Sequence, residues 1–165
     1  SDLEACSFLR TLASTKLGGN FLELGTGTGL STAWILDGMD NASKLTSIDF
    51  DESVLSIAER FLGVDKRLKL ELIDGEEWIN SNKGACFDYI FADTWHGKYL
   101  MLSEVLEMLK IGGFYIVDDM LPQPNWPDGH SEKAENFIEK LESFQFLNIT
   151  KLNWSTGIIV ATRNY

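Results

Sequence analysis

The chain has little cysteine, little proline and no long hydrophobic run. It contains only two cysteines, Cys6 and Cys86, which is too few for a disulfide framework or a cysteine-based metal cluster. We therefore expect reduced thiols and a cytoplasmic location. No apolar run approaches the roughly 18 residues that a membrane helix requires, and the residues from Ser1 do not form a signal-peptide pattern. The sequence predicts no membrane partner.

Positive charge is also scarce. The 165 residues include 14 Lys and Arg against 25 Asp and Glu, which gives a formal net charge of -11 and a pI near 4.5. Such a surface repels phosphates, so the composition argues against a nucleic-acid partner. Hydrophobic residues make up 44% of the chain, as is typical of a globular protein. We predict one domain over 1–165 that acts on a small molecule.

Hydrophobic periodicity indicates alternating strands and helices. Helices include one around 102–109, expected to stop at Gly112, and one near 134–141, which Ser131 would cap. The run 68–73 alternates apolar and charged residues, which favours an edge strand. The last two predicted strands are joined by so few residues that they must be antiparallel. The remaining predicted strands are 21–24, 45–48, 89–92 and 114–117, followed by the final pair 146–152 and 157–162.

A glycine-rich segment follows the first predicted strand. Gly25, Gly27 and Gly29 alternate before a helix, where glycine lets the backbone turn tightly and approach a ligand closely. A dinucleotide fingerprint would require glycine in place of Leu30. Asp49 ends the second strand, about 20 residues after Gly29. A carboxylate at that place can accept hydrogen bonds from both hydroxyls of a ribose. These residues favour an adenosine-containing ligand, and the acidic surroundings favour a sulfonium over a pyrophosphate.

These motifs resemble the class I S-adenosylmethionine-dependent methyltransferases, and more narrowly the metal-dependent catechol and caffeoyl-coenzyme A O-methyltransferases. The resemblance lies in 21–31, in 47–51, which looks like the family's ribose-binding segment, and in 73–76, which sits where the family contacts adenine. It covers almost the whole chain. It implies an α/β fold with a Rossmann-like, doubly wound, seven-stranded sheet in a three-layer αβα arrangement, ordered 3-2-1-4-5-7-6 with strand 7 antiparallel. The implied cofactor contacts are Glu23, Gly25, Thr26, Gly27, Gly29, Ser31, Asp49, Phe50, Asp74, Gly75 and Asp93.

Two later segments, 91–99 and 112–119, resemble the metal-dependent group. In that group, the positions of Asp93, Asp118 and Asp119 bind a divalent cation, and such oxygen ligands suit Mg²⁺. The cation would hold the acceptor and lower the pKa of its attacking hydroxyl. The group usually has Asn at the position of Asp119, so the expected site carries an additional negative charge.

The expected catalytic base also differs from the family pattern. Its usual lysine is replaced by His96, which can accept a proton near neutral pH, and Lys98 is the reserve candidate. Metal ligation and a bystander position in a solvated loop are the other interpretations of His96. The predicted catalytic residues are therefore His96 and Asp93. Trp95 and Trp126 are candidates for walls against an aromatic acceptor.

The resulting hypothesis is transfer of a methyl group from S-adenosylmethionine to the hydroxyl of a phenol or catechol, assisted by a divalent cation. One alternative is a metal-independent methyltransferase acting on a carboxylate, amine or carbon. Another is a non-catalytic module that binds the cofactor, and a nicotinamide dehydrogenase is disfavoured by Leu30. The sequence does not identify the acceptor or the assembly state. A homodimer is one of the assembly states that it leaves open.

Overall fold

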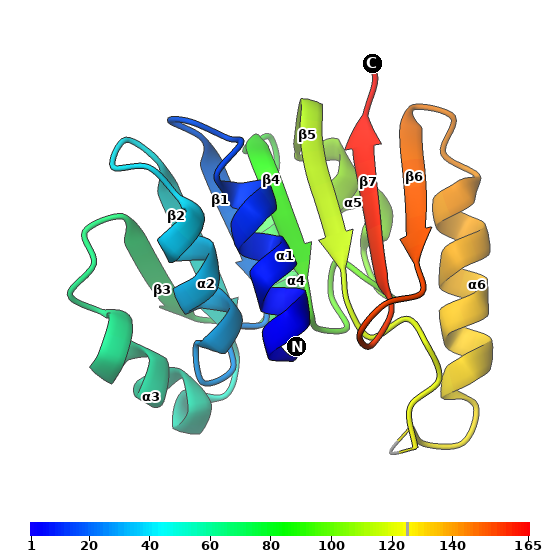
Figure 1. The fold of residues 1–165 in the computed structure, drawn as a ribbon, viewed down its shortest axis with the longest axis horizontal. Helices are drawn as coiled ribbons and strands as arrows, with labels where there is room; N and C mark the ends of the chain where they lie inside the picture. The colour runs from blue at the N-terminus through cyan, green and yellow to red at the C-terminus, as the bar shows by residue number, and fades with distance from the viewer. Residues whose placement is uncertain (125) are drawn as a thin grey trace.

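The computed structural model describes residues 1–124 and 126–165, and its strands form one seven-stranded sheet (Figure 1). The strands are β1 (Asn20–Leu24), β2 (Lys44–Asp49), β3 (Leu68–Leu72), β4 (Phe87–Ala92), β5 (Leu109–Val117), β6 (Leu147–Leu152) and β7 (Ile158–Arg163). The helices are α1 (Leu3–Ala13), α2 (Leu30–Gly38), α3 (Glu52–Leu62), α4 (Gly75–Ser81), α5 (Leu102–Glu107) and α6 (His130–Glu142).

The strand order is β3-β2-β1-β4-β5-β7-β6, as the resemblance implied. Strands β1 to β5 pair in parallel, whereas β7 is antiparallel to both β5 and β6. The predicted edge position of β3 and the predicted antiparallel final pair are therefore confirmed. Parallel pairing brings the carboxyl ends of β1 to β5 to one edge, where an open α/β sheet binds its ligands.

Helices cover both faces of this sheet (Figure 1). On one face, α1 and α2 pack onto the strands through buried side chains such as Leu9 and Ile35. On the other face, α4, α5 and α6 contribute Ile79, Leu106 and Phe137 to a second apolar cluster. The central strands are therefore buried on both sides, which explains their continuous apolar runs. No helix in the described ranges is long and apolar enough to cross a membrane.

Two local predictions are wrong. The helix expected around 102–109 ends at Glu107, and Leu109 instead begins β5. Pairing of Leu109 with Phe87 buries it in the sheet, so the apolar residue that extended the helical stripe belongs to a strand. Gly112, with a φ of 74°, consequently lies inside β5 and does not end the helix.

The start of α6 also differs from the prediction. Gly129 is its N-cap residue, with a φ of 79° and no side-chain capping bond, and Ser131 lies one residue inside the helix. Asn125 lies outside the described residues. Cys6 is buried and Cys86 is exposed, and both are free cysteines, consistent with the expected absence of a disulfide framework.

Candidate active site

A cavity of about 330 Å³ lies at the carboxyl ends of β1, β2 and β4, and we call it the main cavity. It is bordered by the glycine-rich loop after β1 and by the first residues after β2 and β4. The predicted cofactor residues that line it are Gly25, Thr26, Gly27, Ser31, Asp49, Phe50 and Asp93. The sequence reasoning missed its other lining residues, which are Ser1, Thr28, Leu30 and Thr94.

Most of these missed residues have a sequence signal. Thr28 and Leu30 lie within the glycine-rich motif, and Thr94 directly follows Asp93. A loop that wraps a ligand presents neighbouring residues to it, so their proximity to predicted contacts was the available signal. Ser1 has no such signal, because it reaches the cavity only through the packing of α1 against the sheet.

The glycine-rich loop is held against β2 by Asp49. The Asp49 carboxylate accepts hydrogen bonds from the backbone N–H of Gly27 at 2.8 Å and of Asp51 at 3.0 Å. Gly25 has a φ of 102°, and a Cβ added there would lie 3.1 Å from the backbone oxygen of Asp93. A side chain at position 25 would therefore be strained and would press β1 away from β4. The loop backbone thus faces the main cavity without side chains that obstruct it.

Glu23 is enclosed by hydroxyl groups. It is fully buried and accepts hydrogen bonds from the hydroxyls of Ser31, Thr32 and Ser47, each at 2.5 Å. Burial raises the pKa of Glu23 to about 7, although the three hydroxyls oppose the shift. Glu23 is absent from the lining of the main cavity, and its contact with the cofactor stays a prediction. Glu23 ties β1 to the start of α2 and to β2.

Two further predicted cofactor residues support helices. Gly29 precedes α2 with a φ of 91°, and a Cβ added there would lie 3.0 Å from the Cβ of Ala58 in α3. Asp74 caps α4 by accepting a hydrogen bond from the N–H of Glu76 at 2.8 Å. Neither residue lines the main cavity, whereas Gly75 lines a smaller cavity beside it.

This smaller cavity, of about 20 Å³, also contains His96. The packing there is tight, since a Cβ added to Gly75 would lie 2.7 Å from the Cβ of His96. Gly25, Asp49 and Phe50 line both cavities, so the smaller one extends the main cavity toward α4. His96 therefore lies on the side predicted to contact adenine.

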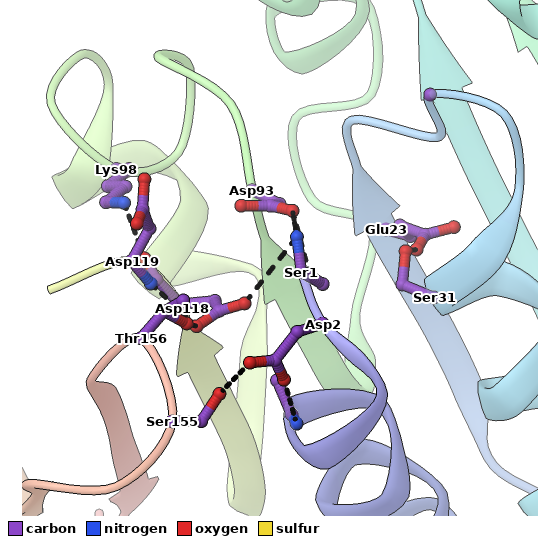
Figure 2. Close-up of polar contacts among 12 residues, drawn as sticks. Ser1, Asp2, Glu23, Ser31, Asp93, Lys98, Asp118, Asp119, Ser155 and Thr156 are labelled. Carbon is purple, nitrogen blue, oxygen red and sulfur yellow. Dashed lines mark hydrogen bonds and ion pairs between the residues drawn. The ribbon is translucent and has the colours of Figure 1, made fainter. Parts of the chain in front are cut away.

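The predicted metal ligands gather at the ends of β4 and β5 (Figure 2). The amino nitrogen of Ser1 lies 3.4 Å from Oδ2 of Asp93 and 3.8 Å from Oδ2 of Asp118. Oδ1 of Asp118 accepts hydrogen bonds from the N–H of Asp119, at 2.7 Å, and from the hydroxyl of Thr156. Its buried Oδ2 has no hydrogen-bond partner among the described residues. Burial raises the pKa of Asp93 above its ordinary value.

Lys98, the reserve candidate for the base, lies beside these acidic residues. Its side chain is buried, and Nζ donates a hydrogen bond to the backbone carbonyl of Asp118 at 2.6 Å (Figure 2). Burial lowers the pKa of Lys98, whereas the charges of Asp93, Asp119 and Asp118 raise it. The structure thus places an ammonium beside the acidic residues and places His96 on the other side of the predicted cofactor site.

This arrangement does not fit the expected Mg²⁺ site. Carboxylate oxygens suit Mg²⁺, but the described part of the chain contains no group of three or more His, Cys, Asp or Glu side chains placed to hold a metal together. Asp119 has a left-handed backbone with a φ of 63°. The buried ammonium of Lys98 would also repel a divalent cation. We therefore derive no step through a metal ion.

The two tryptophans proposed as acceptor walls lie toward α6. Trp95 is 48% exposed, and its ring centroid lies 5.5 Å from that of Tyr99. Trp126 packs on His130 with a centroid distance of 4.4 Å. Neither tryptophan lines the main cavity. Their contact with an acceptor stays a prediction.

A family model described as a methyltransferase domain matches residues 22–120. The chain belongs to this methyltransferase family. The matched range contains the glycine-rich loop, Asp49 and the acidic residues after β4 and β5. The resemblance to class I S-adenosylmethionine-dependent O-methyltransferases is thereby confirmed at the level of the family, and the strand order agrees with it.

Individual relatives of this methyltransferase are distant. "Probable caffeoyl-CoA O-methyltransferase 1" of Dictyostelium discoideum is 23% identical over 176 residues, covering 97% of this chain and 76% of that protein. "Catechol O-methyltransferase B" of Danio rerio is 29% identical over 119 residues, covering 65% of this chain and 44% of that protein. The crystal structure of an O-methyltransferase from Bacillus cereus in complex with SAH is 21% identical, with a TM-score of 0.83, covering 99% of this chain and 82% of that one. This structural likeness confirms the fold.

Proposed function

We propose that this methyltransferase transfers a methyl group from S-adenosylmethionine to a hydroxyl of a small-molecule acceptor. The main cavity carries the proposal, because the glycine-rich loop and Asp49 line the same space as Asp93. The loop offers close backbone approach, and Asp49 offers a carboxylate at the end of β2, which together suit an adenosine-containing ligand. The relatives named as O-methyltransferases, one of them in complex with SAH, support this choice.

Within this proposal, the adenosine part lies toward the smaller cavity and the reacting end lies toward Asp93. Asp49 would accept hydrogen bonds from the ribose hydroxyls, and Ile73, Gly75 and His96 would surround the adenine ring. When bound, the cofactor supplies a methyl group made electrophilic by its sulfonium. We assign His96 to this binding role because it lines the smaller cavity, whereas Lys98 binds the backbone carbonyl of Asp118.

The chemistry then depends on two groups, the half-buried Asp93 and the buried Lys98. Asp93 lines the main cavity, and its raised pKa makes it a better acceptor for the proton of an attacking hydroxyl than an ordinary aspartate. The ammonium of Lys98 stabilises negative charge on the acceptor oxygen, and this attraction is stronger in a buried site than in water. The bound cofactor would supply the methyl group to this oxygen, and its sulfur would keep the electrons of the broken bond. This version of the reaction requires no divalent cation.

Methyl transfer from S-adenosylmethionine carrying an isotopically labelled methyl group tests the proposal on a panel of phenols, catechols, amines and carboxylates. We expect the label on a hydroxyl oxygen, identified by mass spectrometry. Turnover restricted to amines or carboxylates would select the other acceptor class. Tight cofactor binding without turnover on any acceptor would select the non-catalytic module, and absence of cofactor binding would reject the site.

The variant Asp93→Asn tests the assigned proton acceptor. We expect kcat to fall by about 10²- to 10⁴-fold, the usual contribution of general acid–base catalysis, with a much smaller change in cofactor affinity measured by calorimetry. Asp128→Asn, at an exposed position in the loop before α6, is the matched control and should retain full activity. Equal kcat values in the two variants would remove Asp93 from the reaction.

A further inference from the structure

A third cavity, of about 210 Å³, lies between the loop after β4 and one face of α6. The cavity lies beside Lys98, on one side of Asp93 and Asp118. The glycine-rich loop lies on their other side. We call it the lysine pocket, because three lysines line it in a chain with only 14 Lys and Arg and a net charge of -11. The lining residues are Lys98, Tyr99, Lys133, Asn136, Phe137 and Lys140.

The geometry of α6 concentrates positive charge on this pocket. Lys133, Asn136, Phe137 and Lys140 follow one another at spacings that place them on one face of a helix. The acidic residues of α6 occupy other faces, because an α-helix has about 3.6 residues per turn and their spacing from Lys133 and Lys140 does not match that period. Glu142, for example, binds Lys151 of β6 at 2.5 Å. The helix therefore presents its two lysines to the pocket and its carboxylates elsewhere.

These lysines are available to a ligand. Among the described residues, no ion pair is formed by Lys98, Lys133 or Lys140. The ammonium of Lys133 lies 4.6 Å from the ring centroid of Trp95, a contact that positions the ammonium without neutralising it. Lys98 donates one hydrogen bond, to the carbonyl of Asp118, and an ammonium has three donors.

Two aromatic side chains, Tyr99 and Phe137, also line the pocket. Phe137 is only 4% exposed and packs in the core of the α6 face. The hydroxyl of Tyr99 lies 3.1 Å from Nε2 of His130, which fixes the ring between the β4 loop and α6. A pocket with rigid aromatic walls and several ammonium groups suits a carbon skeleton that carries a negatively charged group.

We propose that the lysine pocket binds an oxyanion, a phosphate or carboxylate group, carried by the methyl acceptor. The inference rests on the proposed function, because Lys98 belongs to both the pocket and the surroundings of Asp93. An acceptor held by its anionic group would have its hydroxyl restrained near the main cavity, which reduces the entropic cost of reaching the reactive geometry. The lysines also offset the repulsion that the acidic chain exerts on any anion.

Titration with inorganic pyrophosphate and with citrate tests the pocket without any acceptor. We expect saturable binding by calorimetry, and the tighter ligand indicates whether phosphate or carboxylate is preferred. The double variant Lys133→Gln/Lys140→Gln should weaken this binding by about tenfold, since each partly exposed pair contributes up to about 1 kcal/mol. Lys83→Gln, an exposed lysine outside the pocket, should bind like the wild type. Equal affinities in all three proteins, or no saturable binding, would overturn the proposal.

A second arm uses a matched pair of acceptors that differ only by a phosphate or carboxylate group. The double variant at Lys133 and Lys140 should lower kcat/KM for the anionic acceptor about tenfold more than for the neutral one. Equal losses on both acceptors would overturn the inference. If no acceptor is methylated by the wild type, the proposed function fails, and the pyrophosphate and citrate titrations still decide whether the pocket binds anions.

Discussion

Glu23 makes the stability of this protein depend on pH, and the variant Glu23→Gln isolates that dependence. The carboxyl is fully buried and its pKa is raised from 4.5 to about 7 by burial. Between pH 4.5 and about pH 7 the folded protein keeps a proton on Glu23 that the unfolded chain has lost. The free energy of unfolding therefore falls as the pH rises from 4.5, and the loss is complete above about pH 7.

The size of this effect follows from the interval between the two pKa values. At about 1.4 kcal/mol per pH unit, the wild type loses about 3 kcal/mol of stability through Glu23 between pH 4.5 and pH 8. Glutamine cannot titrate, so Glu23→Gln loses nothing over this range. Ser31 bonds one carboxylate oxygen, and Thr32 and Ser47 bond the other. In the variant, the amide oxygen still accepts on one side and the NH2 donates on the other, where the hydroxyls can rotate to accept. Any mismatch adds an offset that does not vary with pH.

Urea unfolding followed by tryptophan fluorescence from pH 4.5 to pH 8 measures the difference between variant and wild type. Relative to the wild type, Glu23→Gln should gain about 3 kcal/mol over this range, because the subtraction cancels all other titrating groups. Glu139→Gln, at an exposed position on α6, is the control and should show a flat difference. A flat difference for Glu23→Gln as well would refute a buried, proton-binding Glu23.

Three further predictions concern the ligand, the backbone and the metal. Asp49→Ala should weaken S-adenosylmethionine binding about 10- to 100-fold by calorimetry, and the exposed Glu52→Gln should not; unchanged affinity in Asp49→Ala would contradict the ribose assignment. Gly97→Ala should lower the free energy of unfolding by about 2–5 kcal/mol, because φ is 83° and the new Cβ would clash with a Leu24 methyl. Gly84→Ala, with a φ of 91° and open space, should cost about 1–2 kcal/mol. Equal losses of stability in the two variants would show that the structure shifts to remove the steric contact at position 97. EDTA should leave methyl transfer unchanged, and a loss restored by Mg²⁺ would support the cation site that the family resemblance implied.

The order of strands and helices could be predicted because it depends on local patterns. Alternation of apolar and charged residues marked β3 as an edge strand, and continuous apolar runs marked β4 as buried on both faces. The glycine-rich loop was recognisable because a tight turn before a helix restricts the residue types that it accepts. The error at Leu109 arose where helical spacing and a strand pairing competed, and the pairing with Phe87 prevailed.

The roles of individual side chains were decided by tertiary structure. Sequence spacing placed His96 and Lys98 two residues apart in one loop, but the path of that loop sends one toward Gly75 and the other toward Asp118. Burial of Glu23 depends on hydroxyls that α2 and β2 bring to β1.

The lysine pocket is likewise a product of tertiary structure. Its residues come from the β4 loop and from α6, which are distant in sequence and meet only because both pack on the same face of the sheet. The sequence by itself determined the pattern of strands and helices and the cofactor loop, because these depend on periodicity and on short contiguous motifs. Its resemblance to a known family implied the sheet order. Only the tertiary structure decided which charges lie together, because charges separated along the chain interact through distances and burial that folding alone creates.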